Sequence, residues 1–199
     1  MSLQCNDFTE ALKVLKEFQG FNELILLQVL LSHSWKGLGR VGTSKVLKMS
    51  ERRVRKIIEI LRAKKLTDES GSLIEESLKK LFETLKIKTV GRGEEFQVTA
   101  YGPLSTQLLE MIASRIVDLR DYLVIGTGSS NSIWMIGVSS GSAGGIIFPR
   151  VPTDYVEKIL REVEWEGLEN SLLIVWKLYE EVRSDAVVIY SLAQLCASS

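Results

Sequence analysis

The first part of the chain has apolar residues at the three- and four-residue spacing that is typical of helices. In residues 51–64 these positions are Val54, Ile57, Ile58 and Leu61. The spacing places them on one buried face of a helix. Ser50 is a good N-cap for this helix because its hydroxyl accepts a backbone N–H. An apolar stripe over residues 23–32, capped by Asn22, predicts an earlier helix, and a short helix beginning near Gly42 or Thr43 separates the two.

The next segment predicts a turn, a helix and a hairpin. Residues 68–72 are rich in turn-forming residues, and residues 75–85 have the apolar spacing of a helix. Two β-rich runs, 87–90 and 96–101, flank a loop that contains glycine and carries Arg92 near its tip. This pattern predicts a β-hairpin.

From Gly102 onward the pattern changes, which favours a first domain over residues 1–100 and a second over 101–199. The second half predicts helices at 104–119, from Thr153 or Asp154, and at 170–182, with strands at 122–125, 133–138, 144–149 and 186–192. The order indicates a small α+β sandwich of the βαββαβ kind, with helices on one face of a mixed sheet.

Charge is distributed unevenly along the 199 residues. The chain has 25 Lys and Arg against 25 Asp and Glu, but the stretch from Trp35 to Leu66 holds eleven cations and only Glu51 and Glu59 as anions. The resulting +9 must be balanced by −9 elsewhere. Such a basic segment on an acidic remainder is typical of a local binding surface for phosphates.

Cations crowd the beginning of the helix predicted at residues 51–64. Arg52 and Lys56 lie opposite the apolar face, and Arg53 and Arg55 flank them. Positive charge at a helix N-terminus opposes the helix dipole, so an external anion is expected to compensate. A short helix, a tight turn and a second helix with outward-facing N-terminal residues is the helix-turn-helix arrangement.

The run from Val41 to Leu66 resembles the helix-turn-helix core of winged-helix transcription regulators. The resemblance implies that Ser44 and Ser50 lie near phosphates. It also implies a recognition helix that carries the four cations at its beginning, with Lys45 and Arg92 as further DNA contacts. Both candidate wings, residues 68–72 and the hairpin at 87–101, are acidic, which departs from the family pattern.

The whole chain also resembles an uncharacterised archaeal family that joins an N-terminal winged helix to an α+β domain. The features that carry this second resemblance are Glu-rich helices, the run Ile146-Ile147-Phe148-Pro149 and the run from Asp185 to Tyr190. It brings no known ligand.

Several catalytic chemistries are excluded by composition. His33 is the single histidine, so a multi-histidine metal site cannot form, and we expect His33 to be a partly packed residue near a helix end. No Cys-x-x-Cys, Walker-type or GxGxxG motif occurs. We therefore expect no enzyme, no metal and no cofactor.

Two Gly/Ser-rich stretches, residues 126–131 and 139–145, follow predicted strands and are most simply explained as connecting loops. Such loops can also present backbone N–H groups to an anion. If a small-molecule effector binds, Gly126, Gly128, Ser129 and Arg150 are the candidate ligand-binding residues.

Other features bear on assembly and location. Helix-turn-helix regulators commonly dimerise, and the face of Leu172, Trp176 and Tyr179 or the helix at 104–119 is a candidate dimer contact. Trp165 and Trp176 are otherwise expected in helix cores. Cys5 and Cys196 lie at opposite ends of the sequence and make no disulfide framework, which favours a reducing cytoplasm. No apolar run is long enough to span a membrane.

These observations favour a cytoplasmic transcriptional regulator that binds double-stranded DNA, with a C-terminal half for ligand sensing or homodimerisation. The alternative is a winged-helix scaffold that contacts other proteins and not DNA.

Overall fold

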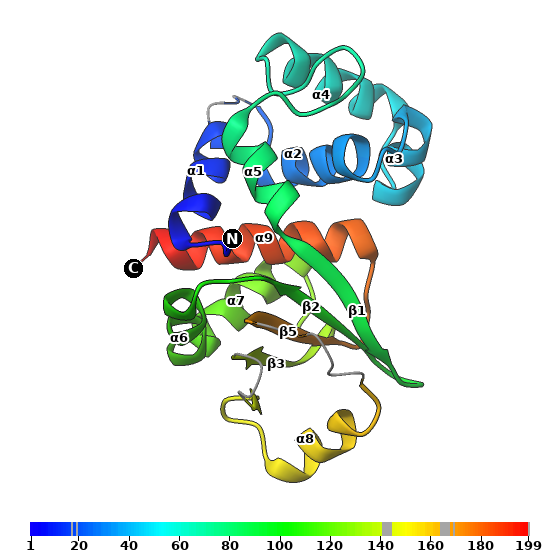
Figure 1. The fold of residues 1–199 in the computed structure, drawn as a ribbon. Coiled ribbons are helices and arrows are strands. Elements are labelled where there is room, and N and C mark those ends of the chain that lie inside the picture. Colours follow the sequence, from blue (N-terminus) through cyan, green and yellow to red (C-terminus); the bar gives the residue numbers. More distant parts are fainter. Residues whose placement is uncertain (17, 19, 141–144, 164–167, 169, 199) are drawn as a thin grey trace.

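A long apolar helix, α9 (Glu181–Ala197), lies at the centre of the fold. The computed structural model describes the chain except for residues 17, 19, 141–144, 164–167, 169 and 199. Figure 1 shows α9 between a group of helices on one side and a β-sheet on the other. Its residues from Val182 to Leu195 are nearly all buried because neighbours cover it on every side.

The helical group contains the N-terminal elements of the chain. They are α1 (Cys5–Lys16), α2 (Glu23–Leu30), a π-helical turn (Leu31–Trp35), α3 (Arg40–Leu47), α4 (Glu51–Ala63) and α5 (Glu76–Thr84). The predicted caps are confirmed: Leu24 N donates to Asn22 Oδ1 over 2.7 Å, and Ser50 caps α4. The four apolar residues expected on the inner face of α4 are buried.

The sheet has five strands in the order β1-β2-β5-β3-β4, and every neighbouring pair is antiparallel. The strands are β1 (Lys86–Arg92), β2 (Gln97–Gly102), β3 (Ile133–Ser139), β4 (Ile146–Ile147) and β5 (Ser171–Trp176). The predicted hairpin is therefore confirmed as β1 and β2. The expected mixed sheet is wrong, since consecutive sheet neighbours run in opposite directions.

Both faces of the sheet are covered. Leu172, Ile174 and Trp176 of β5 point towards α9, whereas Leu173 and Val175 point to the other face and join a second cluster with Ile159 of α8 (Thr153–Leu160). This alternation follows the two-residue period of a strand. Helices were expected on one face only, and α8 corrects that expectation.

Three segments of the second half have a different secondary structure from the one predicted. Residues 122–125 belong to helix α7 (Ile116–Thr127), residues 171–176 form strand β5, and residues 186–192 belong to α9. The helix predicted at 104–119 is divided at Arg115 into α6 (Thr106–Ser114) and α7. Continuous apolar runs are ambiguous between buried strands and buried helices, which explains these exchanges.

The second half buries one candidate dimer face and most of the other. Leu172 and Trp176 are fully buried, so their face is not open to a second copy of the chain. Most apolar residues of the segment 104–119 lie in the main core, but Val117 is exposed. Trp165 lies outside the described residues.

The two halves of the chain share one sheet and one core. The expected domain boundary at residue 100 falls inside β2, which pairs with β1 on one side and β5 on the other. The main hydrophobic cluster contains residues of α1, α4, α7 and α9 together. Packing is thus continuous across that boundary.

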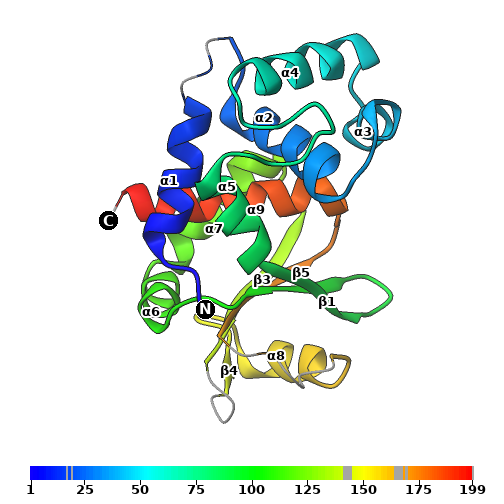
Figure 2. The ribbon, with the colours of Figure 1, turned by 45° about the horizontal axis from the view of Figure 1, so that its top comes forward.

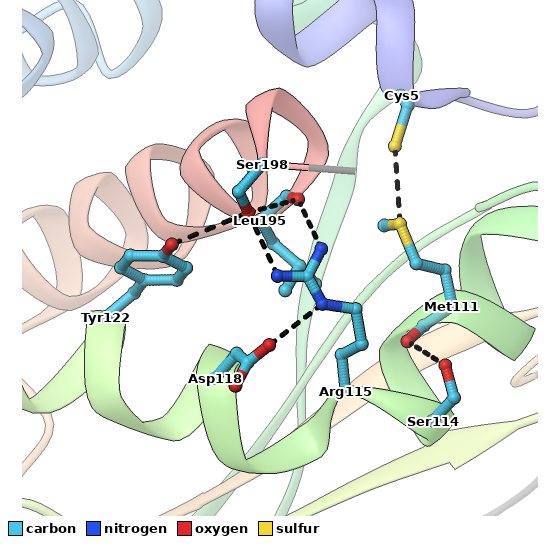
Figure 3. A network of polar contacts seen from close by, with 8 residues as sticks. All are labelled: Cys5, Met111, Ser114, Arg115, Asp118, Tyr122, Leu195 and Ser198. Carbon is cyan, nitrogen blue, oxygen red and sulfur yellow. Dashed lines mark hydrogen bonds and ion pairs between the residues drawn. The ribbon is translucent and has the colours of Figure 1, made fainter.

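The two ends of the chain are held together. Cys5 and Cys196 form a disulfide, with Cα atoms 5.3 Å apart, although their positions at opposite ends of the sequence gave no indication of a disulfide framework. The reason is that α1 packs beside α9 and brings residues 191 positions apart into contact. Figure 3 shows the adjoining polar contacts, in which Arg115 bonds Asp118 of α7 and the Leu195 carbonyl and Ser198 hydroxyl at the end of α9.

Candidate nucleic-acid interface

The turn between α3 and α4 is held by local hydrogen bonds. Lys48 ends α3 in the left-handed region, with φ 53° and ψ 39°. The Ser44 hydroxyl donates to the Met49 carbonyl over 2.6 Å, and the Arg53 backbone N–H donates to Ser50 Oγ over 3.4 Å. The Ser44 hydroxyl is thus used inside the turn, while Ser50 is exposed at the beginning of α4.

The cations expected on α4 project into solvent. Arg52, Arg53, Arg55 and Lys56 are all exposed, and Lys45 on α3 is exposed beside them. Val54 and Ile57, which alternate with these cations, are fully buried and anchor the helix from behind. The apolar anchoring therefore fixes the direction in which the cations point.

Few of the basic residues between Trp35 and Leu66 are neutralised by carboxylates. In the described part of the chain, ion pairs occupy Lys36 with Glu181, Arg40 with Glu51, and Lys48 with Glu180. None of those described pairs includes the cations at the beginning of α4. Lys56 lies over the ring of Phe21 at 5.8 Å from its centroid, a contact that leaves its charge uncompensated.

A shallow hollow of about 410 Å³ lies beside α4. Its lining residues are His33, Arg40, Arg55, Ile58, Glu59 and Arg62. Arginine is well suited to phosphate because its planar guanidinium presents several donors. Arg40 and Arg62 were not singled out from the sequence. Arg62 comes seven residues after Arg55 and so lies on the same face of α4, whereas Arg40 could be placed beside them only from the packing of α3 against α4.

The histidine is partly packed near a helix end, as predicted. His33 Nδ1 lies 3.2 Å from the Leu38 carbonyl oxygen, and its Nε2 is buried without a described partner. The ring faces Gly71, where a Cβ atom would lie 2.7 Å from Nε2. This contact fixes the turn at residues 68–72 against the helical group.

Of the two candidate wings, the turn at residues 68–72 is the one beside α4. Arg62 Nη2 donates to the Glu69 carbonyl over 2.7 Å, and a bridge between Thr67 and Leu73 closes a minimal hairpin. Asp68 is acidic in this turn, and hydrogen bonds from Ser70 and Ser72 lower its pKa. The turn is therefore held in shape by its acidic residue.

The longer hairpin, β1 and β2, points away from α4 in both views (Figures 1 and 2). Arg92 is exposed on β1 and donates to Gln97 Oε1 over 2.7 Å. The structure does not bring Arg92 together with the cations of α4.

The candidate effector residues are also separated from one another. Gly126 lies inside α7, where a Cβ would meet Val187 at 2.7 Å, and Gly128 ends α7 with φ 71°, followed by Ser129. Arg150 follows β4 and precedes α8, outside the pocket that Gly126 lines. Gly126 therefore lies where two helices pack together. The strand that was expected before it, at residues 122–125, is part of α7. Most of the second loop, residues 141–144, lies outside the described residues.

A buried polar cluster that the sequence did not reveal connects the sheet to α9. Tyr101 and Tyr179 donate to Asp185 Oδ1 over 3.0 and 2.9 Å, and Asp185 is 1% exposed. Burial raises the pKa of this carboxyl to about 6, although the two phenols and Lys36 oppose the shift. Burial also raises the pKa of Tyr101 and that of Tyr179. The cluster lies one turn beyond Glu181, which pairs with Lys36.

The described residues contain no group of three or more His, Cys, Asp or Glu side chains arranged to hold a metal ion. None of the described helices combines the length and apolar character needed to cross a membrane.

Comparison with known proteins gives little information. No family model matches the chain, and no curated protein matches it. One solved structure, hypothetical protein PH0730 from Pyrococcus horikoshii OT3, is similar over 88% of this chain and 89% of its own, with 16% identity and a TM-score of 0.44. That degree of likeness carries no argument about fold or function.

Proposed function

We propose that this protein is a transcriptional regulator that binds double-stranded DNA through α3 and α4. The observation that carries the proposal is the set of exposed cations at the beginning of α4, which no described carboxylate pairs. A helix with such a beginning fits the major groove, where arginine reads guanine edges. Lys45 and Ser50 are exposed beside these cations and are suited to contact the flanking phosphates.

We extend the proposal to a winged-helix unit and a role for the second half. The short hairpin at residues 66–74 lies beside α4, and this position supports its assignment as the wing. Its acidic turn is a poor phosphate contact, so affinity in this account rests on α3 and α4. The α+β half would then sense a ligand or mediate homodimerisation.

The proposed dimer uses the exposed part of the helix expected at 104–119 together with residues that follow it. Val117 and Ile125 of α7 and the neighbouring Leu178 are exposed apolar residues. Two copies joined there would present two recognition helices to a palindromic site. Sedimentation that finds only monomer at tens of micromolar protein would contradict this part of the proposal.

A cytoplasmic location also belongs to the proposal, because that is where DNA is accessible in cells without a nucleus. The Cys5–Cys196 disulfide is unusual there, since cytosolic disulfides are rare outside hyperthermophiles. The two cysteines therefore no longer support the cytoplasmic location that DNA binding requires.

The test is a fluorescence anisotropy titration of random duplex DNA at low salt with wild type and with Arg52→Ala/Lys56→Ala. We expect the variant to bind at least tenfold more weakly. The matched control is Lys88→Ala/Arg120→Ala, which removes the same two charge types from exposed positions on β1 and α7. Equal affinities of wild type and the α4 variant would refute the proposal.

One observation favours the alternative of a protein-interaction scaffold. Val41 and Val46 are 51% and 40% exposed on α3, next to the basic residues. Exposed apolar side chains in this position suit a protein partner as well as a thymine methyl group. A protein that co-purifies with the chain, together with no binding of duplex DNA at low salt, would favour the scaffold.

A further inference from the structure

A small polar pocket lies where the helical group meets the α+β half. It has a volume of about 110 Å³ and is lined by residues from α2, the end of α7, the beginning of β3 and the beginning of α9. The polar lining residues that matter here are Gln28, Ser132, Glu180, Arg183 and Ser184. The pocket is distinct from the cation surface of α4.

Two of these side chains are largely buried and hydrogen-bond no described residue. Gln28 is 8% exposed and Ser132 is 6% exposed. Their polar atoms are not among the described side-chain atoms that are fully enclosed without a partner, so the amide and the hydroxyl open into the pocket that both residues line. Both groups are therefore available to a molecule inside the pocket.

The charged residues of the pocket are the donor Arg183 and the carboxylate Glu180. Arg183 Nη1 donates to Glu180 Oε2 over 2.7 Å, while the described residues leave Nε and Nη2 of Arg183 without a partner. The Gln28 amide and the Ser132 hydroxyl add further donors. A guanidinium edge with neutral donors around it is the environment that a carboxylate prefers.

We propose that this pocket binds a small carboxylate, held by Arg183, Ser132 and Gln28. A cavity of about 150 Å³ accommodates benzene, so the present volume limits the ligand to roughly four to six non-hydrogen atoms. Glu180 lies beside Arg183 and provides a place for an ammonium group if the ligand is an α-amino acid. A short hydroxy acid would use the same carboxylate contacts without it.

The pocket is connected to the α3–α4 turn through one carboxylate. Glu180 bonds Arg183 with Oε2 and Lys48 with Oε1, each over 2.7 Å. A ligand that engages Arg183 changes the partners of Glu180 and hence the anchoring of Lys48, the last residue before the turn into α4. This regulatory consequence rests on the proposed DNA-binding function, whereas the ligand site does not.

The site is tested by isothermal titration calorimetry with L-lactate and L-alanine as separate probes. Saturable one-to-one binding of either supports the site, and binding of alanine alone assigns the ammonium contact to Glu180. Arg183→Gln is expected to weaken binding at least tenfold, and the control Arg120→Gln, which changes an exposed arginine on α7 outside the pocket lining, is expected to leave it unchanged. Absence of binding of both probes at millimolar concentration overturns the proposal.

Gln28→Leu gives a second, independent test. Leucine fills a similar volume and removes the unpaired amide, so this variant is expected to lose ligand binding while its Tm stays equal to or above that of wild type. Full binding by Gln28→Leu would contradict the assigned site. A Gln28→Leu variant with a lower Tm than wild type would show that the amide stabilises the fold. That result would overturn the claim that the amide serves the ligand.

The coupling is measured separately, as DNA affinity with and without the bound probe. A change of several-fold is expected, and equal affinities overturn the coupling. Failure of the protein to bind any DNA overturns the proposed function, and the calorimetry still decides the ligand site.

Discussion

Lys48 Nζ lies 2.7 Å from Glu180 Oε1, and this ion pair connects the α3–α4 turn to the residue before α9. Lys36 forms a parallel connection to Glu181, also at the beginning of α9. The cations nearest the α+β half are thus used to hold the two parts together, and those at the beginning of α4 are left for an external anion.

The Lys48–Glu180 pair is expected to contribute little to stability at neutral pH. Lys48 is 68% exposed, and exposed pairs contribute about 0.2–1 kcal/mol. A double-mutant cycle with Lys48→Met and Glu180→Gln measures the coupling. Hydrogen bonds from Lys48 and Arg183 lower the pKa of Glu180, so the coupling is present above the ordinary pKa of 4.5 and is lost as the pH falls below it. A coupling that persists in acid would contradict this explanation.

The buried Asp185 predicts an opposite dependence on pH. Its folded pKa of about 6 exceeds its ordinary value of 3.8, so the folded protein binds more protons than the unfolded chain between these values. The stabilising contribution is complete below about pH 4 and is lost as the pH rises through 6. At about 1.4 kcal/mol per pKa unit, the change is about 3 kcal/mol.

Asp185→Asn removes this titration and keeps an acceptor for both phenols. We expect the unfolding free energy of the variant, relative to wild type, to improve by about 3 kcal/mol between pH 4 and pH 7. Urea unfolding at several pH values measures the difference. Parallel pH profiles for the two proteins would show that Asp185 does not titrate in this range.

Gly71 and Gly128 distinguish two destabilising effects of adding a side chain, which are backbone strain at positive φ and a clash with a neighbouring residue. Both have positive φ, 93° and 71°, but only at Gly71 would a Cβ meet a neighbour, His33 Nε2 at 2.7 Å. Gly128→Ala is expected to destabilise by about 1 kcal/mol from backbone strain alone, and Gly71→Ala by at least about 1 kcal/mol more. The additional cost should shrink in a His33→Ala background. Equal losses for the two glycine variants would contradict the contact.

The disulfide between Cys5 and Cys196 closes almost the entire chain. Loss of a cross-link with so large a loop typically costs about 2–5 kcal/mol. Cys5→Ser/Cys196→Ser is therefore expected to unfold at lower denaturant concentration, and a reductant should lower the stability of wild type but not of the variant. A reductant effect on both proteins would point to a different cause.

The N-terminal helices could be predicted from the sequence because each has one buried face. In α4 the charged residues between Val54 and Leu61 give a clear period of 3.6 residues, and Ser50 supplies a recognisable cap. The candidate cations follow directly from this face, since whatever lies opposite the buried residues must face solvent.

The second half could not be predicted in the same way because its central elements are buried on all sides. Along α9, neighbours cover the helix around its circumference, so the run from Ala186 to Leu192 shows no helical period. All six residues of β5 are likewise buried, and no alternation distinguishes the strand from a helix. The Asp185 cluster and the pocket at Gln28 depend on these contacts and have no local signal in the sequence.

The central claim is that the cations at the beginning of α4 neutralise DNA phosphates. The most direct measurement is the salt dependence of duplex binding for wild type, Arg52→Ala and the control Arg120→Ala. The slope of log Kobs against log salt concentration is expected to be steep for wild type and to decrease in magnitude by about 1 for Arg52→Ala, with no change for the control. An identical slope for all three proteins, or binding that does not depend on salt, would contradict the claim.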